Sequence, residues 1–384
     1  MDFTYDDEQI ALREAARGLV GKAYSDYEQR RRTVGDDPGF DEALWGQLAE
    51  MGLLGLPFPE DDGGAGAGPI ETAIVCQELG RVLAPEPYLS AVVLAGGLVA
   101  AVGTAEQRKA LLEPLAAGES LLAFAHDEPG RRWSASAHDV TADAEGRLTG
   151  VKDGVLHGAR ADVLIVSAAL PDGGTGLFVV DGDALAGLER TGYRLPDGGR
   201  AARVVFDATA ATPLGEAGAD VTEAICEALD LTQVMAANEA LGMMQTQLRA
   251  TTEYLKSRKQ FGVTLNTFQA LTFRAADMYT SLELTQSLVD WATMVAAEGD
   301  AAALHEAAAR VGLQVSRAGR HIGQEAIQLH GGIGMTAEYS VGMYTAHLTV
   351  LDHLLGDAGH HLRTLDATLD EHDLLDPLAR AAGD

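Results

Sequence analysis

The sequence predicts an α+β fold in three parts, with an N-terminal α-helical domain over residues 1–120, a small middle β domain over 121–215 and a C-terminal helical bundle over 216–384. Helical periodicity runs through both ends of the chain, whereas the middle holds short β-type runs between turn residues. No long helices alternate with those runs, so we expect a small antiparallel barrel or sandwich in the middle. The C-terminal part is expected to form a four-helix bundle.

The N-terminal part is predicted to consist of capped amphipathic helices. Asp6 and Asp7 can cap a first helix. The apolar residues that follow them at helical spacing are Ile10, Leu12, Ala15 and Leu19. A second helix is expected to end at Gly52. A third is expected from Ile70 to Leu83, stopped by the prolines that follow.

A glycine-rich stretch, Gly63 to Gly68, lies between the second and third helices. No β-type run precedes it, and its glycines do not follow the G-x-G-x-x-G spacing of dinucleotide-binding turns. We therefore interpret it as a flexible loop and not as a phosphate-binding turn.

Three β-type runs define the middle part: Val163 to Val166, Leu177 to Val180 and Arg203 to Phe206. Turn clusters at Pro171 to Gly174 and Pro196 to Gly199 separate them. Helical periodicity then returns. Apolar residues recur every seven positions at Val234, Leu241, Leu248 and Leu255, as expected for a helix packed in a bundle. Two further long helices are predicted over 271–297 and 301–329.

The charge of the chain excludes some classes of partner. With a net charge of -29, the protein lacks the basic face that nucleic acid or an anionic membrane requires.

No stretch approaches the ~20 apolar residues of a membrane span, and the N-terminus has no signal-peptide pattern. Cys76 and Cys226 form neither a disulfide framework nor a metal motif, and His360 and His361 lack a third ligand at useful spacing. We expect a soluble cytoplasmic protein without a bound metal.

Two motifs in the C-terminal part are more specific. Ser257-Arg258-Lys259-Gln260-Phe261-Gly262 closes a long helix and is followed by Phe268-Gln269-Ala270. Gln328-Leu329-His330-Gly331-Gly332-Ile333-Gly334 closes another. Nearer the N-terminus stand Leu44-Trp45, Met51-Gly52-Leu53-Leu54-Gly55-Leu56 and Gln77-Glu78-Leu79-Gly80-Arg81. With these segments in this order, the chain resembles the acyl-CoA dehydrogenase family from Asp2 to Leu369.

The resemblance implies FAD as cofactor and an acyl-CoA as substrate. In this family the flavin lies between the β domain and the bundle of one subunit, while the bundle of a neighbouring subunit covers the ADP half. The residues that match the family's cofactor-binding positions are Arg258, Phe261, Gln269, Gln328, Gly331 and Gly332. Arginine offers a charged fork for a diphosphate, glutamine both donates and accepts hydrogen bonds, and glycine allows close backbone approach. Each residue alone would also fit an ordinary surface or helix-capping role, but their joint match favours cofactor binding.

The catalytic base of the family is missing at both of its usual positions. Family members use a glutamate to remove the α-proton while hydride leaves the β carbon for the flavin. Counted from Gly331, the commoner glutamate position falls on Leu355. When the segment from Leu241 to Gln245 is aligned with the family, the rarer position falls on Thr232. Neither side chain is a base at neutral pH. Asp357 is a further, weaker candidate two residues beyond Leu355, since a solvated loop aspartate beside His360 and His361 explains it somewhat better. Glu239 is expected to have an interhelical or surface role.

The β domain also departs from the family pattern. The flavin-contacting Thr-Glu-Pro-Gly-Ala-Gly-Ser-Asp run becomes Ala125-His126-Asp127-Glu128-Pro129-Gly130-Arg131-Arg132. The Trp-Ile-Thr-like segment matches Val155-Leu156-His157, which has no aromatic platform. The chain thus keeps the residues that reach a neighbour's FAD and has lost many that hold its own.

We interpret the protein as a partner subunit of a heteromeric α2β2 acyl-CoA dehydrogenase. The resemblance implies that such pairs act in actinobacterial steroid and cholesterol side-chain degradation, with an electron-transferring flavoprotein as acceptor. Three alternatives stay open: a self-sufficient homotetrameric dehydrogenase that uses Asp357 or another base, a non-catalytic scaffold subunit, and a flavin monooxygenase or acyl-CoA oxidase.

Overall fold

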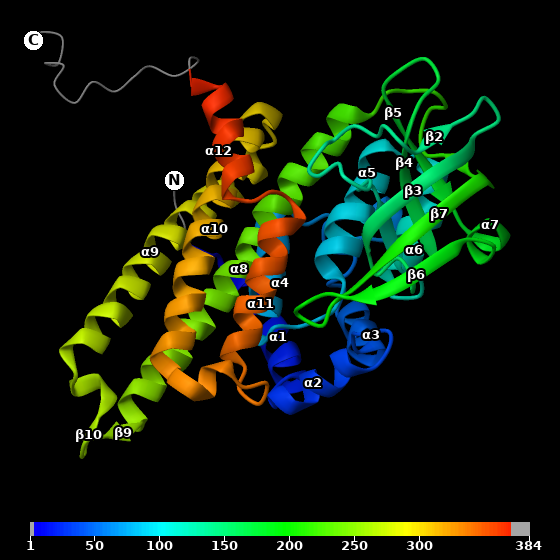
Figure 1. Cartoon of the computed structure of the whole chain (residues 1–384). Coiled ribbons are helices and arrows are strands. Elements are labelled where there is room, and N and C mark those ends of the chain that lie inside the picture. The colour runs from blue at the N-terminus through cyan, green and yellow to red at the C-terminus, as the bar shows by residue number, and fades with distance from the viewer. Residues whose placement is uncertain (1–3, 370–384) are drawn as a thin grey trace, which may run out of the picture.

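A computed structural model describes residues 4–369 and contains the three predicted parts (Figure 1). Helices at the N-terminal end pack beside a β domain, and long helices of the C-terminal part form a bundle (Figure 1). The α+β fold class is therefore confirmed. None of the described helices combines the length and the apolar character needed to cross a bilayer.

The N-terminal helices follow the predicted caps. Asp6 caps the first helix: its carboxylate accepts from the backbone N–H of Gln9 at 2.8 Å, and its own backbone N–H donates to Oε1 of Gln9 at 3.2 Å. The helix that follows the glycine loop begins at Pro69 and ends at Leu83 in a left-handed conformation. The helical elements of this part are α1 (Asp7–Ala23), α2 (Tyr27–Gly35), α3 (Glu42–Glu50), η1 (Glu60–Asp62), α4 (Pro69–Val82), η2 (Tyr88–Gly96), α5 (Gly97–Val102) and α6 (Ala105–Ala116).

One helix of this part is of a type that the sequence did not predict. η2 is a π-helix of nine residues, most of them buried, that continues directly into α5. Runs of π-helix are rare and usually last a single turn, so apolar periodicity of 3.6 residues does not reveal them.

The middle part is a sheet in the order β6-β7-β3-β2-β4-β5-β8, with β1 paired to β4 off this path. Its elements are β1 (Leu122–Ala125), β2 (Thr141–Ala142), β3 (Arg147–Leu156), β4 (Val163–Ala169), β5 (Thr175–Val180), α7 (Gly182–Ala186), β6 (Glu189–Arg194), β7 (Arg200–Ala210) and β8 (Thr212–Pro213). All three predicted β-type runs lie within strands. Most pairs are antiparallel, but β4 pairs in parallel with both β1 and β2, which the predicted antiparallel arrangement did not include.

The apolar run in β4 is explained by burial on both faces. Val163 and Ile165 belong to the core shared with the helices, whereas Leu164 and Val166 belong to the separate core of the β domain. Because successive side chains of a strand point to opposite faces, a strand that is buried on both sides reads as continuously apolar.

The C-terminal part is built on one long helix. α8 (Thr222–Ser257) has 36 residues, and the four apolar residues predicted at seven-residue spacing are all buried in it. The remaining elements are β9 (Lys259–Gln260), β10 (Val263–Thr264), η3 (Leu265–Thr267), α9 (Gln269–Glu298), α10 (Ala301–His330), η4 (Gly331–Met335), α11 (Val341–Leu354) and α12 (Ala358–Ala367). α8 packs against α9, α10 and α11 and also against α4 of the N-terminal part.

Two glycines allow α4 and α8 to cross in direct backbone contact. A Cβ atom at Gly80 would overlap the carbonyl oxygen of Glu239, and one at Gly242 would overlap the carbonyl oxygen of Gln77. Neither glycine has a positive φ, so close packing and not backbone conformation requires them. The crossing joins the N-terminal part to the bundle through a common core.

We expect Gly80→Ala to destabilise the protein by about 1–3 kcal/mol, because the added methyl group must push two backbones apart. The matched control is Gly18→Ala in α1, where a Cβ meets no atom within 4 Å. That control should stabilise by about 0.5–1 kcal/mol through the better helix propensity of alanine. Chemical denaturation measures the change in the free energy of unfolding for both variants. Equal changes in Gly80→Ala and Gly18→Ala would contradict the packing role of Gly80.

Candidate functional site

The residues predicted to bind a cofactor lie at the end of the bundle farthest from the β domain (Figure 1). Arg258 directly follows α8, and its backbone N–H donates to the carbonyl oxygen of Tyr254 at 2.8 Å. A short hairpin then pairs β9 with β10. The backbone N–H of Leu265 closes the hairpin by donating to the carbonyl oxygen of Arg258 at 2.9 Å. The hairpin therefore holds the backbone at Arg258 in place.

Phe261 stands at the tip of this hairpin. Phe261 and Gly262 both have positive φ, as the two central residues of a tight type I′ turn require. This conformation is unfavourable for a phenylalanine, and its side chain is 91 % exposed with only an edge-to-face contact to Phe268. A large apolar side chain held in the open on a strained turn is typical of a contact site for another molecule.

The end of α10 lies beside the end of α8. The rings of Tyr254 and His330 stack with centroids 4.6 Å apart, so the two helix ends are held together. Gly331 ends α10 with a positive φ and leads into η4, where Ile333 and Met335 are exposed. Arg258 and the segment from Gln328 to Gly332 therefore lie at the same end of the bundle.

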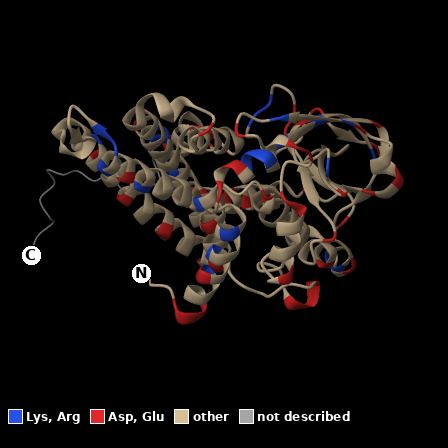
Figure 2. Ribbon diagram, turned by 90° about the horizontal axis from the view of Figure 1, so that it is seen from below, with Lys and Arg blue, Asp and Glu red and all other residues tan. Residues whose placement is uncertain are grey.

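Polar groups on this surface have no partners of their own. Within residues 4–369, no hydrogen bond or ion pair engages the side chains of Arg258, Gln269 or Gln328, and all three are exposed. Lys256 and Lys259 flank the arginine, so the hairpin end carries positive charge in an otherwise acidic chain, as the blue residues at that end of the bundle show (Figure 2). This arrangement suits an anionic group that another molecule brings to the surface.

The predicted base positions lie at the other end of α8. Thr232 precedes Arg258 by 26 residues, which is ~39 Å along a helix. Its side chain is buried, and its hydroxyl donates to the carbonyl oxygen of Ala228 at 2.6 Å. Leu355 ends α11 and is partly buried beside a cavity of about 180 Å³. The site residues thus fall into two separate groups.

Asp357 serves as the N-cap of α12. Its carboxylate accepts from the backbone N–H of His360 at 2.8 Å, and this bond lowers the pKa of Asp357. A lowered pKa makes a carboxylate a weaker base. His361 packs into the space that Gly312 leaves on α10. Among the residues that the structure describes, no three His, Cys, Asp or Glu side chains are placed to hold a metal ion.

The crevice between the β domain and the bundle is closed by a buried charge network. His347 on α11 donates from Nδ1 to Asp197 in the β6–β7 loop, and from Nε2 to Glu239 on α8 at 2.8 Å. Burial alone would lower the pKa of His347, but the two carboxylates raise it to about 9. The imidazole is therefore protonated at neutral pH and bridges two anions. The interhelical role expected for Glu239 is confirmed.

Further polar contacts fill the same crevice. Arg30 on α2 donates to the carbonyl oxygens of Leu83 at 2.5 Å and Asp197 at 3.3 Å. The hydroxyl of Tyr24 donates to Glu86 at 2.5 Å, and burial raises the pKa of Glu86 to about 7. The cavity left among these groups is only about 80 Å³. Sites for small molecules usually measure ~300–1,000 Å³. No motif in the sequence pointed to His347 or Asp197.

The altered β-domain segment is ordered by a buried ion pair. The Nζ of Lys152 donates to Glu128 at 2.9 Å, to Ser167 at 3.1 Å and to the carbonyl oxygen of His126 at 2.7 Å. Burial would raise the pKa of Glu128, but backbone N–H groups of Val140 and its neighbours, together with Lys152, lower it to about 2. The segment is therefore well anchored, even though its outer residues no longer match the family's flavin-contacting run.

Comparison with known proteins gives a consistent picture. Residues 6–119 match the model of the acyl-CoA dehydrogenase N-terminal domain, and residues 222–369 match that of the C-terminal domain. The chain is 29% identical to acyl-CoA dehydrogenase FadE27 of Mycobacterium tuberculosis, covering 97% of this chain and 99% of that protein.

Two solved assemblies are also similar. One chain of a variant of the Tcur3481–Tcur3483 steroid acyl-CoA dehydrogenase is 32% identical and has a TM-score of 0.84, covering 95% of this chain and 98% of that one. One chain of the ChsE4–ChsE5 complex from Mycobacterium tuberculosis is 27% identical and has a TM-score of 0.86, covering 97% of this chain and 100% of that one.

The His347 network makes stability depend on pH. Since the pKa of this histidine rises from 6.5 in the unfolded chain to about 9 in the folded one, the stabilisation is complete below pH 6.5 and is lost as pH rises through 9. We expect the free energy of unfolding to fall by up to ~3 kcal/mol between pH 6.5 and 9.5. His347→Gln should flatten this fall, whereas His321→Gln, on the neighbouring helix α10, should retain it. Urea denaturation between pH 6.5 and 9.5 measures the free energy of unfolding of each variant. If His347→Gln keeps the pH dependence of the wild type, His347 is not the group responsible for it.

Proposed function

Because the chain belongs to the acyl-CoA dehydrogenase family, we propose that it is one subunit of an FAD-dependent dehydrogenase and completes the FAD site of a partner subunit. The observation that carries this proposal is the contrast between the two ends of the C-terminal bundle. The hairpin end keeps open, unpaired cofactor-binding groups, while the crevice where a flavin and an acyl chain would enter is closed and lacks a base.

The hairpin end fits one half of an FAD molecule, the cofactor of this family. Arg258 would hold the diphosphate, and Gln269 and Gln328 would bond to polar groups of the nucleotide. Gly331 and Gly332 would let the backbone approach it closely, and Phe261 would cover it. Bound FAD supplies the acceptor for the hydride that leaves the acyl chain. Arg258 follows Thr232, the base position on α8, by ~39 Å along the helix, so the hairpin groups are suited to a cofactor held by another subunit.

The crevice of this chain does not fit a flavin. Its two cavities of about 80 and 180 Å³ are smaller than ordinary cofactor sites. Opening the smaller cavity would require breaking the contacts of His347 with Asp197 and Glu239, which would leave buried charges unpaired. At the base positions, Thr232 is bonded to its own helix and Leu355 has no ionisable group. We therefore assign no proton transfer to this subunit.

The partner we propose is a second dehydrogenase-like chain in an α2β2 assembly. Two solved relatives are named as pairs of different chains, and one of them is described as a steroid acyl-CoA dehydrogenase. By this likeness we propose a steroid side-chain acyl-CoA as substrate, desaturated between its α and β carbons. The family likeness also favours an electron-transferring flavoprotein as the acceptor.

Flavin content tests the proposal directly. The chain purified alone should hold far less than one FAD, whereas the complex with its partner should be yellow and oxidise an acyl-CoA. In that complex, changing the partner's glutamate to glutamine should reduce turnover by ~10²–10⁴-fold, and Asp357→Asn in this chain should leave it near normal. A fully flavin-loaded and active single chain would refute the proposal.

Arg258→Ala should weaken flavin binding by the assembled complex. The arginine would make a charge-assisted contact worth ~1.5–3 kcal/mol, so the dissociation constant of FAD should rise roughly ten- to a hundred-fold. The fold should be unaffected, since the side chain is exposed and unpaired. Lys256→Ala, at the same exposed helix end, is the matched control and should change affinity little. Equal flavin affinity in Arg258→Ala and wild type would show that Arg258 is an ordinary surface residue.

A further inference from the structure

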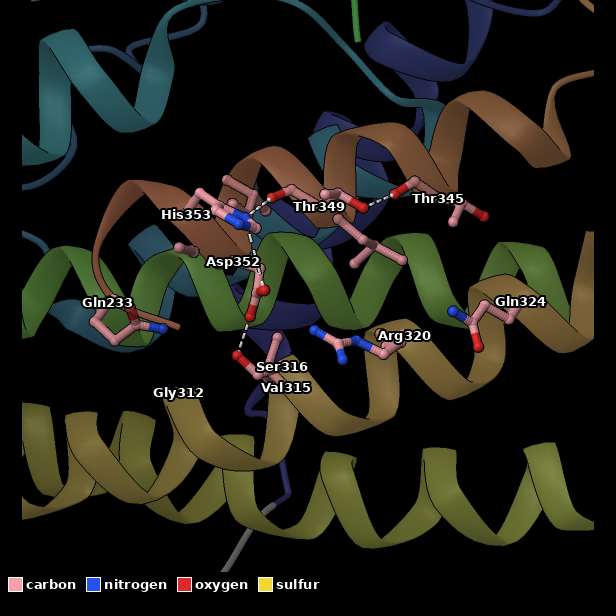
Figure 3. Close-up of a pocket in the computed structure, with 15 residues that line it drawn as sticks. Gln233, Gly312, Val315, Ser316, Arg320, Gln324, Thr345, Thr349, Asp352 and His353 are labelled. Carbon is pink, nitrogen blue, oxygen red and sulfur yellow. Dashed lines mark hydrogen bonds and ion pairs between the residues drawn. The ribbon is translucent and has the colours of Figure 1, made fainter. Parts of the chain in front are cut away.

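Cavities lie on two sides of α11, and they differ in how their polar groups meet water. The larger one, of about 250 Å³, lies between α8, α10 and α11, and Arg320 on its wall is exposed (Figure 3). Water satisfies such a side chain, so that cavity indicates no ligand. The smaller one is the crevice cavity of about 80 Å³ beside His347, and none of the described residues that line it is exposed.

Three residues that line the crevice cavity each have a buried polar atom without a hydrogen bond. The atoms are Nη1 of Arg30, Oε2 of Glu86 and Nδ1 of His157, and no described residue bonds to any of them. The three side chains are more than nine-tenths buried. Arg30 lies on α2, Glu86 between α4 and η2, and His157 directly after β3. Buried polar atoms are normally paired, so a cavity that gathers three unpaired ones from separate elements is expected to hold a polar occupant.

The charge of Arg30 indicates that this occupant is an anion. The other nitrogens of its guanidinium donate only to backbone carbonyl oxygens, those of Leu83 and Asp197. In the part of the chain that the structure describes, no carboxylate forms an ion pair with Arg30. A buried charge without a counter-ion is costly. Water would bond to the free N–H groups but would not neutralise the charge, whereas an anion does both.

The charged groups around the cavity permit an anion. Arg30, Arg200 and the protonated His347 are positive, and Asp197 and Glu239 are negative. Asp37, which pairs with Arg200 at 2.9 Å, has a side chain that is 87% exposed, so water screens its charge. The lining of the cavity is therefore net positive whenever Glu86 is neutral.

Glu86 makes this condition depend on pH. Its Oε1 accepts from the hydroxyl of Tyr24 at 2.5 Å and from the backbone N–H of Asp41 at 3.2 Å, which leaves Oε2 free to carry a proton. Burial raises the pKa of Glu86 to about 7. Below that pH the carboxyl group is protonated and donates to an anion, whereas above it the carboxylate repels one.

His157 supplies a further donor. Burial, together with the neighbouring charge of Arg200, lowers the pKa of His157 to about 4, so the imidazole is neutral at physiological pH. The tautomer with its proton on Nδ1 donates from the atom that has no partner in the fold. The volume of about 80 Å³ holds roughly three water-sized groups, which limits the anion to a few atoms.

We propose that the crevice cavity binds a small, singly charged oxyanion of the size of formate or bicarbonate. The anion accepts from Nη1 of Arg30, from Nδ1 of His157 and from the protonated carboxyl group of Glu86. It connects α2, the segment between α4 and η2, and the end of β3, and so stabilises the closed crevice. Its binding requires neither FAD nor a partner subunit.

Thermal unfolding of the full chain tests the site when sodium formate replaces sodium pivalate at constant ionic strength. Pivalate carries the same carboxylate but is too large for the cavity. At about pH 6 the unfolding midpoint should rise with formate concentration, because a ligand that binds only the folded chain stabilises it. The dissociation constant derived from this rise should increase about tenfold per pH unit above 7, as Glu86 ionises. In Glu86→Gln it should stay constant over the same pH range, since an amide donates at every pH.

Arg30→Gln and His157→Phe should each weaken formate binding by about tenfold or more, because each removes one donor to the anion. Arg32→Gln is the matched control, since Arg32 is exposed on the same helix and does not line the cavity. It should respond to formate as the wild type does. Circular dichroism before heating establishes that each variant is folded. Equal midpoints of the wild type in formate and in pivalate would show that the cavity holds only water, and an undiminished response in the folded Arg30 and His157 variants would likewise overturn the proposal.

Discussion

The contact of His347 with Asp197 and Glu239 determines how the rest of this molecule can be used. It links the β6–β7 loop to two helices of the bundle, and it does so with charges that are largely withdrawn from water. Burying an ion is costly unless its partners are close and well oriented, and a protonated imidazole between two carboxylates meets that condition. Once formed, the network resists opening, because separating the β6–β7 loop from the bundle would leave an unpaired buried charge on each side. The β domain is thus held against the bundle.

The hairpin end of the bundle has a different character. At the hairpin, Arg258 is unpaired and Phe261 is held in an unfavourable conformation at the tip of a turn. Neither feature improves the stability of the isolated chain, since the exposed ring lacks burial and the positive φ is strained. Both become favourable when a second molecule covers them. A surface that adds little to the stability of the isolated chain, and that is complementary to an anionic nucleotide, suits a subunit that contributes to another subunit's site.

The fold was predictable from the sequence because its signals are local and repeated. Capping residues, seven-residue apolar spacing and β-type runs each depend on a few neighbouring positions, and the corresponding helices and strands formed where expected. The elements that were missed lack such signals. A π-helix has no apolar period of 3.6, and the parallel pairing of β4 with β1 and β2 depends on contacts between distant segments. The motifs around Arg258 and Gln328 were recognisable for a different reason, namely their resemblance to motifs of the acyl-CoA dehydrogenase family, whose C-terminal domain model matches residues 222–369.

The crevice network was not predictable, because its three members come from distant parts of the sequence and none belongs to a motif. Asp197 lies in a predicted turn cluster, and His347 lies in none of the motifs. Their meaning arises only when the β6–β7 loop reaches the bundle. The same logic applies to the positions where the family keeps its base. The sequence places Leu355 and Thr232 there, and neither side chain is a base at neutral pH. No motif reveals, however, that the β6–β7 loop and the bundle bury a charge network between them. That arrangement depends on contacts between segments far apart in the chain, and only the folded structure shows them.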